Sequence, residues 1–243
     1  MNKPIDTIWI SHRGLAQVHI ENTQAAFEQA CDAGFNYLET DLQSCKDDHI
    51  VLCHEPNVSK ISDLSANISE MTRQQLSNIS LYNGAKLLFL DEFIKIFSQK
   101  RWVFDIKPET ATQTINNLKL MFKNKDHLVN NIIFLFWGEN EQRLFLNDFP
   151  QAVCFARSDE CYRAGFAMLL ALGYGAKIKK NKIYSLHSKF FGLPLLNKKI
   201  VQRFHDRGAK VLGYLPESDK DVQRCLSAGV DYILSNHAPP LSS

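Results

Sequence analysis

Short apolar runs alternate with amphipathic segments along nearly the whole chain. Runs rich in β-branched and aromatic residues are typical of buried strands, and we place strands at residues 7–10, within 37–54, and at 101–105, 131–137, 152–156, 182–186, 210–214 and 232–234. Between them, helical spacing of apolar residues predicts helices at residues 24–33, 91–99, 112–123, 141–148, 160–172, 197–207 and 219–228. Eight strands separated by helices predict a closed (β/α)8 barrel.

One segment departs from this alternation. Residues 55–82 are polar and rich in Ser and Asn, so we interpret them as an excursion after the second strand, over the top of the barrel, with one short helix at residues 72–78. No internal repeat or linker is evident, and we expect a single domain over residues 1–243. Because neither a GxGxxG nor a P-loop pattern occurs, an open nucleotide-binding sheet is the less favoured alternative.

The composition narrows the class of partner. With 45% hydrophobic and 22% charged residues and a net charge of +2, the chain has no basic footprint for nucleic acid. Its longest apolar stretch, residues 166–172, is far short of a bilayer span, so we expect no integral membrane segment. A start that reads directly into a strand, and six cysteines without a C-x-x-C pair, predict a cytoplasmic protein with reduced thiols. The oligomeric state stays open.

Two carboxylates stand out in the stretch of residues 37–54. Glu39 and Asp41 are two positions apart in an extended run, so a strand points both to the same face. Two buried carboxylates repel each other unless a cation lies between them, which indicates a metal site. A solvated strand face is the alternative for an isolated ExD pattern. Here the apolar neighbours Leu38 and Leu42 favour the metal site.

Polar residues also follow two other strands. His12 and His54 stand at strand ends, where they suit a general base and a general acid for displacement at phosphorus. Arg13 would clamp a phosphate oxygen, and Lys107, on the same face as Asp105, would add a second positive charge. Each histidine could instead be structural, and both cations could instead form ion pairs with the nearby carboxylates.

Other residues suggest weaker hypotheses. His187, after the sixth strand, is a candidate for the mouth of the barrel. Cys53 and His54 do not suggest a catalytic pair, because neighbours in a strand point to opposite faces. Phe134, Phe136 and Trp137 are expected to fill the barrel and its rim; the remaining histidines (His19, His49, His127, His205 and His237) are expected at the surface or in structural roles.

Several short motifs, in an order that spans nearly the whole chain, resemble those of the glycerophosphodiester phosphodiesterase family. The N-terminal motifs read His12-Arg13-Gly14, Glu21-Asn22-Thr23, Ala33-Gly34, Glu39-Thr40-Asp41, Lys46-Asp47-Asp48 and His54-Glu55. The mid-chain ExKP motif reads Asp105-Ile106-Lys107-Pro108, and the C-terminal GVDxI motif reads Gly229-Val230-Asp231-Tyr232-Ile233. Residues 186–187 and 211–214 are similar to the cytoplasmic bacterial branch of the family.

This resemblance implies a TIM barrel that hydrolyses a small-molecule phosphodiester, in lipid and glycerol metabolism, to an alcohol and glycerol 3-phosphate. It implies one divalent cation, Mg²⁺ or Ca²⁺, as cofactor. Carried over position by position, the metal ligands are Glu39, Asp41 and Asp105, the catalytic pair is His12 and His54, the phosphate-binding residues are Arg13 and Lys107, and Glu21 lies near the metal and His12.

Departures from the family pattern leave the substrate open. Asp105 stands where the family has Glu, and its arm is shorter. Tyr214-Leu215-Pro216-Glu217 replaces an aromatic-Thr-Val-Asn segment at a possible pocket rim, where Glu217 would repel an anionic head group. Two alternatives therefore remain: a related phosphodiesterase acting on lysophospholipid or phosphoinositide head groups, and a barrel that binds phospholigands without turnover.

Overall fold

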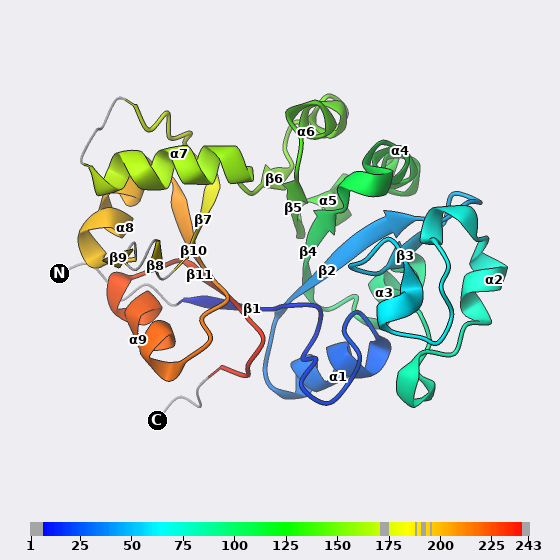
Figure 1. Ribbon diagram of the computed structural model, residues 1–243. Helices are drawn as coiled ribbons and strands as arrows, with labels where there is room; N and C mark the ends of the chain where they lie inside the picture. Colours follow the sequence, from blue (N-terminus) through cyan, green and yellow to red (C-terminus); the bar gives the residue numbers. More distant parts are fainter. Residues whose placement is uncertain (1–6, 171–174, 188, 191–192, 195, 240–243) are drawn as a thin grey trace. The chain divides into compact units, whose positions relative to one another are not determined.

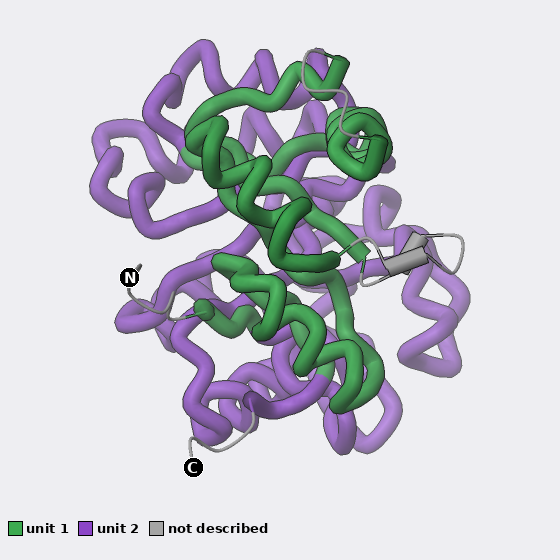
Figure 2. Tube along the Cα trace, turned by 90° about the vertical axis from the view of Figure 1, so that its left-hand side faces the viewer, with its two compact units in different colours: residues 1–10, 153–236 green, residues 11–152, 237–243 purple. Residues whose placement is uncertain are grey.

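A computed structural model describes residues 7–170, 175–187, 189–190, 193–194 and 196–239 (Figure 1). The described residues divide into two compact units (Figure 2). The larger unit contains residues 11–152 and 237–239, and the smaller unit contains residues 7–10 and 153–236.

The larger unit contains a parallel sheet extended by one antiparallel strand. Strand β4 (Arg101–Ile106) pairs in parallel with both β2 (Tyr37–Ser44) and β5 (Ile132–Phe136), while β3 (Ile50–Leu52) pairs antiparallel with β2. Its helices are α1 (Gln24–Asp32), α3 (Leu90–Ile96), α4 (Ala111–Phe122), α5 (Asp126–Val129) and α6 (Glu139–Leu146). The β2–β4 register places Asp41 directly opposite Asp105.

The predicted helix at residues 24–33 begins at Gln24, and Thr23 caps it, because its hydroxyl accepts a hydrogen bond from the backbone N–H of Ala26. Behind the sheet, aromatic rings pack edge to face and in tilted pairs; those fully buried include Phe27, Phe93, Trp102, Phe104, Phe134 and Phe145. This apolar layer fixes β2 and β4 from one side, so that their polar residues must lie on the other side.

Residues 55–82 have more structure than their composition indicates. The predicted helix is present as α2 (Arg73–Ser77), with a capping box between Thr72 and Gln75, and three 3-10 helices occur at Val58–Lys60, Ile68–Glu70 and Tyr82–Gly84. Val58, Ile68 and Leu76 are fully buried in a hydrophobic cluster with residues of β3 and its flanks. The widely spaced apolar residues of this segment therefore form a small core.

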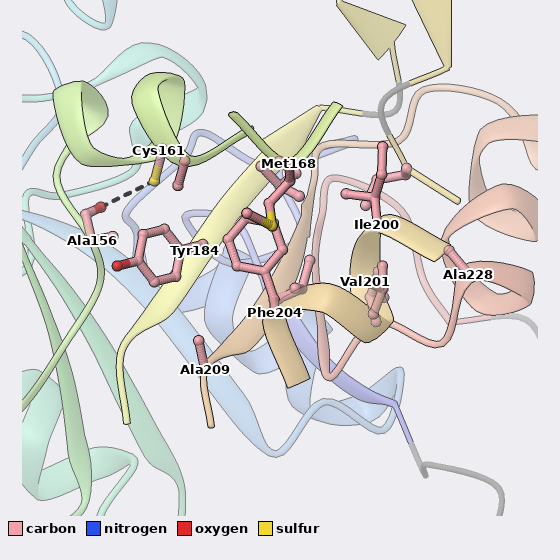
Figure 3. Close-up of a cluster of buried hydrophobic side chains, with 14 of the residues drawn as sticks. Ala156, Cys161, Met168, Tyr184, Ile200, Val201, Phe204, Ala209 and Ala228 are labelled. Atoms are coloured by element: carbon pink, nitrogen blue, oxygen red, sulfur yellow. Dashed lines mark hydrogen bonds between the residues drawn. The ribbon is translucent and has the colours of Figure 1, made fainter. Parts of the chain in front are cut away.

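The smaller unit is built from parallel strands and three helices. Strands β1 (Ile8–Ser11), β11 (Tyr232–Ser235), β10 (Lys210–Tyr214) and β7 (Ile183–His187) are neighbours in this order, and β6 (Val153–Cys154) precedes a parallel bridge to β7. A short antiparallel ladder joins β8 (Lys189–Phe190) and β9 (Leu193–Pro194). Helices α7 (Ser158–Leu169), α8 (Lys198–His205) and α9 (Asp219–Ala228) complete the unit. Its core contains Met168, Tyr184 and Phe204 (Figure 3).

All eight predicted strands are present and alternate with the predicted helices along the chain, so the (β/α)8 fold class is confirmed. Helix boundaries differ from the prediction by a few residues; the predicted helix at residues 160–172 ends at Leu169, and residues 171–172 lie outside the described residues. Helix α5 and the β8–β9 ladder were not predicted. Within the described ranges, no helix has both the length and the apolar character needed to cross a membrane.

Candidate active site

Three buried carboxylates converge in the larger unit. Glu39 and Asp41 project from β2, and Asp105 projects from the register-paired position of β4. Each offers an oxygen within 4.8 Å of the others, and none is more than 7% exposed. The predicted same-face geometry of the ExD pattern is therefore confirmed, and the parallel register adds the third carboxylate.

Two cations lie against this group. Lys107 Nζ is 3.5 Å from Asp41 Oδ1 and 3.4 Å from Asp105 Oδ2. Arg13 Nε is 3.0 Å from Asp41 Oδ2, and the backbone N–H of Arg13 donates to Glu39 Oε2 at 3.0 Å. The alternative of ion pairing is thus realised for both cations. The two cations do not neutralise the three buried carboxylates, because Arg13 also binds a fourth carboxylate, that of Glu21. The Glu21 oxygens lie 2.9 and 3.1 Å from Arg13 Nη1.

The pKa values of the buried carboxyl groups are raised, in part because carboxylates outnumber cations at this site. Burial, then the repulsion from Asp41 and Asp105, raises the pKa of Glu39 well above its usual value, although Arg13 opposes the shift. Burial raises the pKa of Asp105 to about 6, even though the Lys107 ammonium lowers it. For Arg13 and Lys107, burial lowers the pKa, but the surrounding carboxylates outweigh burial and raise it. Both cations therefore stay protonated at neutral pH.

A tight turn after β1 carries His12 and Arg13. The backbone of Arg13 is left-handed (φ 54°), and Gly14 follows with φ 81°. A Cβ at Gly14 would lie 2.6 Å from the carbonyl carbon of Ala26, so only glycine lets the turn approach α1 this closely. His12 is half-buried and stands between the end of β1 and Arg13, where the turn fixes its backbone.

Asn22, the middle residue of the Glu21-Asn22-Thr23 motif, positions Asp41. Its amide donates to Asp41 Oδ2 at 2.9 Å and accepts from the Thr40 hydroxyl at 2.7 Å. Its backbone is left-handed (φ 60°), and its N–H donates to the carbonyl of Arg13. Asn tolerates this conformation better than most residues, and this tolerance was the signal available in the sequence.

Trp137 was expected only to fill the barrel rim, but it contacts the site. Its indole N–H donates to Asp105 Oδ1 at 2.8 Å, and Lys107 Nζ lies 5.3 Å from its ring centroid. The side chain is 51% exposed, whereas Phe134 and Phe136 are buried as predicted. A tryptophan that ends an apolar strand gives no sequence signal for such a contact.

His54 follows β3 and lines a pocket of about 350 Å³ together with Arg13, Glu21 and Glu55. Its Nδ1 lies 3.3 Å from Glu55 Oε1, and the ring is 30% exposed. The pocket also contains the Lys60 side chain, whose ammonium is 2.5 Å from the same Glu55 oxygen. The predicted acid–base candidate thus has access to solvent in a pocket that Arg13 also lines.

The predicted rim residues belong to the smaller unit. His187, at the end of β7, packs edge to face on Tyr214 of β10, with ring centroids 4.8 Å apart. Glu217 follows β10 and is exposed. The structure therefore brings two of these three residues into contact.

The donor set fits a hard divalent cation. Three carboxylates supply the oxygen ligands that Mg²⁺ and Ca²⁺ prefer. Asp41 Oδ1 is buried, lies 3.5 Å from the Lys107 ammonium and accepts no hydrogen bond from any described residue, so it retains lone pairs for an ion. A bound cation would also offset the repulsion that raises the pKa of Glu39.

A (β/α)8 fold with buried carboxylates and cations at neighbouring strands defines a class of barrel enzymes that act on anionic substrates. The family is identified by the family model described as the glycerophosphoryl diester phosphodiesterase family, which matches residues 12–239. The chain belongs to this family, whose members hydrolyse glycerophosphodiesters and depend on a metal, and the prediction of an enzyme of this type is confirmed.

Three similar proteins illustrate the relationship. A glycerophosphodiester phosphodiesterase of Caldanaerobacter subterraneus is 21% identical over 239 residues, covering 95% of this chain and 94% of that protein. Lysophospholipase D GDPD1 of Mus musculus is 39% identical over 123 residues, covering 47% of this chain and 38% of that protein. The solved structure of an Oleispira antarctica phosphodiesterase, in complex with the product sn-glycerol-3-phosphate, shares the fold, with a TM-score of 0.74, 19% identity and coverage of 95% and 93%.

Proposed function

We propose that the chain hydrolyses glycerophosphodiesters to an alcohol and glycerol 3-phosphate, with one divalent cation held by Glu39, Asp41 and Asp105. The observation that carries this proposal is the convergence of these carboxylates, within 4.8 Å of one another, on Arg13 and Lys107. The structure of the Oleispira phosphodiesterase in complex with its product, sn-glycerol-3-phosphate, supports the choice of product.

A bound cation would act as a Lewis acid on the phosphate and neutralise one of its oxygens. Lys107 and Arg13 remain charged at neutral pH and bind the other oxygens, which lowers the repulsion that an incoming nucleophile meets. Glu21 holds the Arg13 guanidinium by two hydrogen bonds and so restricts its orientation.

His12 and His54 transfer the protons. His12 accepts the proton of the attacking hydroxyl. Attack by water gives glycerol 3-phosphate directly, whereas attack by the glycerol hydroxyl of the substrate gives a cyclic phosphate that a water molecule must then open. His54 then donates a proton to the oxygen of the leaving alcohol. The Glu55 carboxylate beside His54 Nδ1 orients the ring, which leaves Nε2 as the nitrogen for transfer. Each histidine contributes about 10²–10⁴-fold to the rate in a mechanism of this kind.

The test is release of glycerol 3-phosphate from glycerophosphocholine with Mg²⁺ or Ca²⁺, before and after chelation. His12→Ala and His54→Ala should each lose at least about a hundredfold in kcat. His49→Ala is the matched control, because His49 is exposed and its Nδ1 lies 3.4 Å from Nη1 of Arg73, a residue outside the proposed mechanism. Full activity in either catalytic variant would remove that histidine from the mechanism, and activity that survives chelation would remove the metal.

A second candidate substrate is a lysophospholipid. The similarity to mouse lysophospholipase D GDPD1, 39% over 123 residues, favours it. Choline release from lysophosphatidylcholine and from glycerophosphocholine, measured side by side, separates the two. A higher kcat/KM for the acylated substrate would identify the lysophospholipid as the preferred one.

A further inference from the structure

Helix α7 exposes a row of large apolar side chains. Tyr162, Phe166 and Leu170 recur every four residues and therefore lie on one face, where 58%, 55% and 51% of their surfaces are exposed. The opposite face supplies Met168 and other small and apolar residues to the core of the smaller unit (Figure 3). The exposed row is thus additional to the face by which the helix is anchored.

A basic segment packs beside this helix. Residues 175–181 contain Lys177, Lys179 and Lys180, all exposed, while Ala176, just before them, is buried in the core to which Met168 belongs. Lys179 Nζ lies 3.0 Å from Oε1 of Glu160 in the first turn of α7, so the segment contacts the helix at that turn.

The charge of this region is strongly positive, although the whole chain carries a net charge of only +2. Residues 158–210 contain 11 Lys and Arg but three Asp and Glu. Of the acids, Glu160 is buried and already paired with Lys179 and Lys182, and Asp159 pairs with Arg157. Lys177 and Lys180 are exposed and therefore present positive charge to solvent in the segment that contacts α7.

We propose that the α7 surface, defined as Tyr162, Phe166, Leu170, Lys177 and Lys180, docks the protein on an anionic lipid membrane. A helix with exposed aromatic and aliphatic residues lies in the interface plane, with its apolar side chains among the lipid head groups, and basic residues close to it in the chain strengthen the binding. The lysines are attracted to the negative surface potential of anionic lipids. The proposal does not depend on the active site, because it uses none of the residues proposed to act in catalysis.

The size of the row favours a membrane over a second protein. Half-exposed aromatic and leucine side chains offer roughly 300 Å² in total, given about 150–250 Å² for a whole aromatic side chain. A stable protein interface needs about 800 Å² on each partner. Shallow insertion into a lipid interface needs less apolar area when charge attraction adds to it.

The test is flotation of the full chain with vesicles of phosphatidylcholine alone or with 30% phosphatidylglycerol, about a third anionic lipid. The parent should float with the anionic vesicles only, and 0.5 M salt, with its Debye length of about 4 Å, should release it. Phe166→Ser/Leu170→Ser and Lys177→Gln/Lys180→Gln should each reduce the bound fraction at least about tenfold. Leu120→Ser is the matched control, because Leu120 is 74% exposed on α4 in the larger unit; it should bind like the parent.

Each variant should keep its hydrolysis of glycerophosphocholine, which separates lost docking from lost folding. Phe166→Trp provides a second readout, because an indole that enters the interface shifts its emission to shorter wavelength when anionic vesicles are added. The proposal is overturned if the parent does not float, if both double variants float like the parent, or if the Phe166→Trp emission does not move. It is equally overturned if light scattering shows a dimer that Phe166→Ser/Leu170→Ser dissociates, because the occupant is then a second copy of the chain.

Discussion

The indole N–H of Trp137 donates a 2.8 Å hydrogen bond to Oδ1 of Asp105. The other oxygen, Oδ2, lies 3.4 Å from the Lys107 ammonium, which in turn sits near the Trp137 ring. Asp105 is therefore held from two sides before any ion binds. Groups that orient a metal ligand in this way commonly affect metal affinity or activity by 10–100-fold.

Trp137→Phe should weaken metal-dependent activity about tenfold while leaving the fold stable, because the side chain is half-exposed and only the donor is removed. Trp137→Ala, which also removes the ring beside Lys107, should lose more. Titration of activity with Mg²⁺ or Ca²⁺ checks this: the Phe variant should need more metal for half-maximal rate. An unchanged metal requirement in both variants would show that Asp105 needs no orientation by the indole.

Replacement of Asn22 separates its two contributions. Asn22→Gly removes the hydrogen bonds to Asp41 and Thr40 and keeps the left-handed backbone, whereas Asn22→Ala also strains it. We expect both to lower the free energy of unfolding by about 1–3 kcal/mol, with Ala about 1 kcal/mol worse than Gly. Urea unfolding measures the difference. Equal stabilities would mean that the turn relaxes around Ala.

The fold was predictable because its strands are short, apolar and regularly spaced. Strand β5 and strand β4, for example, are nearly continuous runs of Ile, Phe, Trp and Val, as expected for strands covered on both faces. Residues 55–82 gave a weak pattern, because their few core residues, such as Ile68 and Leu76, are separated by polar surface positions. The periodic spacing of apolar residues that identifies helices and strands does not identify a core built largely from 3-10 turns.

The part of the site that lies on strands was predictable, because side chains alternate between the two faces of a strand. Glu39, Asp41 and Asp105 follow from side-chain direction and register. The contacts of Trp137 and Asn22 were not predictable, because they depend on the path of a loop and of a strand end rather than on periodicity. The proximity of His187 to Tyr214 follows from the pairing of β7 with β10, which sequence order alone does not give.

Metal binding should tighten as the pH rises from about 5 to about 7, because a carboxylate must lose its proton to become a ligand. The pKa of Asp105 is raised from its usual 3.8 to about 6. In the metal-free protein, the contribution of Asp105 to stability is therefore present below pH 3.8 and is lost as the pH rises through about 6. A cation that binds the ionised form reverses this loss.

Thermal melts with Ca²⁺ or with EDTA check this linkage. The Tm difference between the two conditions should be larger at pH 7.5 than at pH 5, a range that brackets the pKa of about 6. Asp105→Asn, which removes the titrating ligand, should give a smaller and flatter difference. The idea fails if the parent gains as much Tm from Ca²⁺ at pH 5 as at pH 7.5.

The stability that Glu160, in α7, contributes should depend on pH in the opposite direction to that of Asp105. Although burial raises it, the pKa of Glu160 falls from 4.5 to about 2, because hydrogen bonds from Lys182, the Arg157 backbone and Lys179 stabilise the carboxylate. The stabilisation is present above 4.5 and is lost as the pH falls towards 2. Glu160→Gln should lower the free energy of unfolding by about 2–3 kcal/mol at pH 7. Urea unfolding at pH 7 and pH 3 should show the deficit shrink at the lower pH; a deficit of equal size at both would assign it to packing.

Gly14 permits the close approach between the His12–Arg13 turn and α1. A methyl group there would meet the Ala26 backbone at 2.6 Å and would also strain a φ of 81°, so Gly14→Ala should lower the free energy of unfolding by about 2–4 kcal/mol. Gly34→Ala is the matched control: Gly34 has a φ of 88° but no atom within 4 Å of the added methyl, so only the backbone strain remains, about 1 kcal/mol. Because the turn carries Arg13, Gly14→Ala should also lower kcat for glycerophosphocholine, whereas Gly34→Ala should not. Equal losses of stability in the two variants would show that α1 moves aside freely and that the close approach does not position the turn.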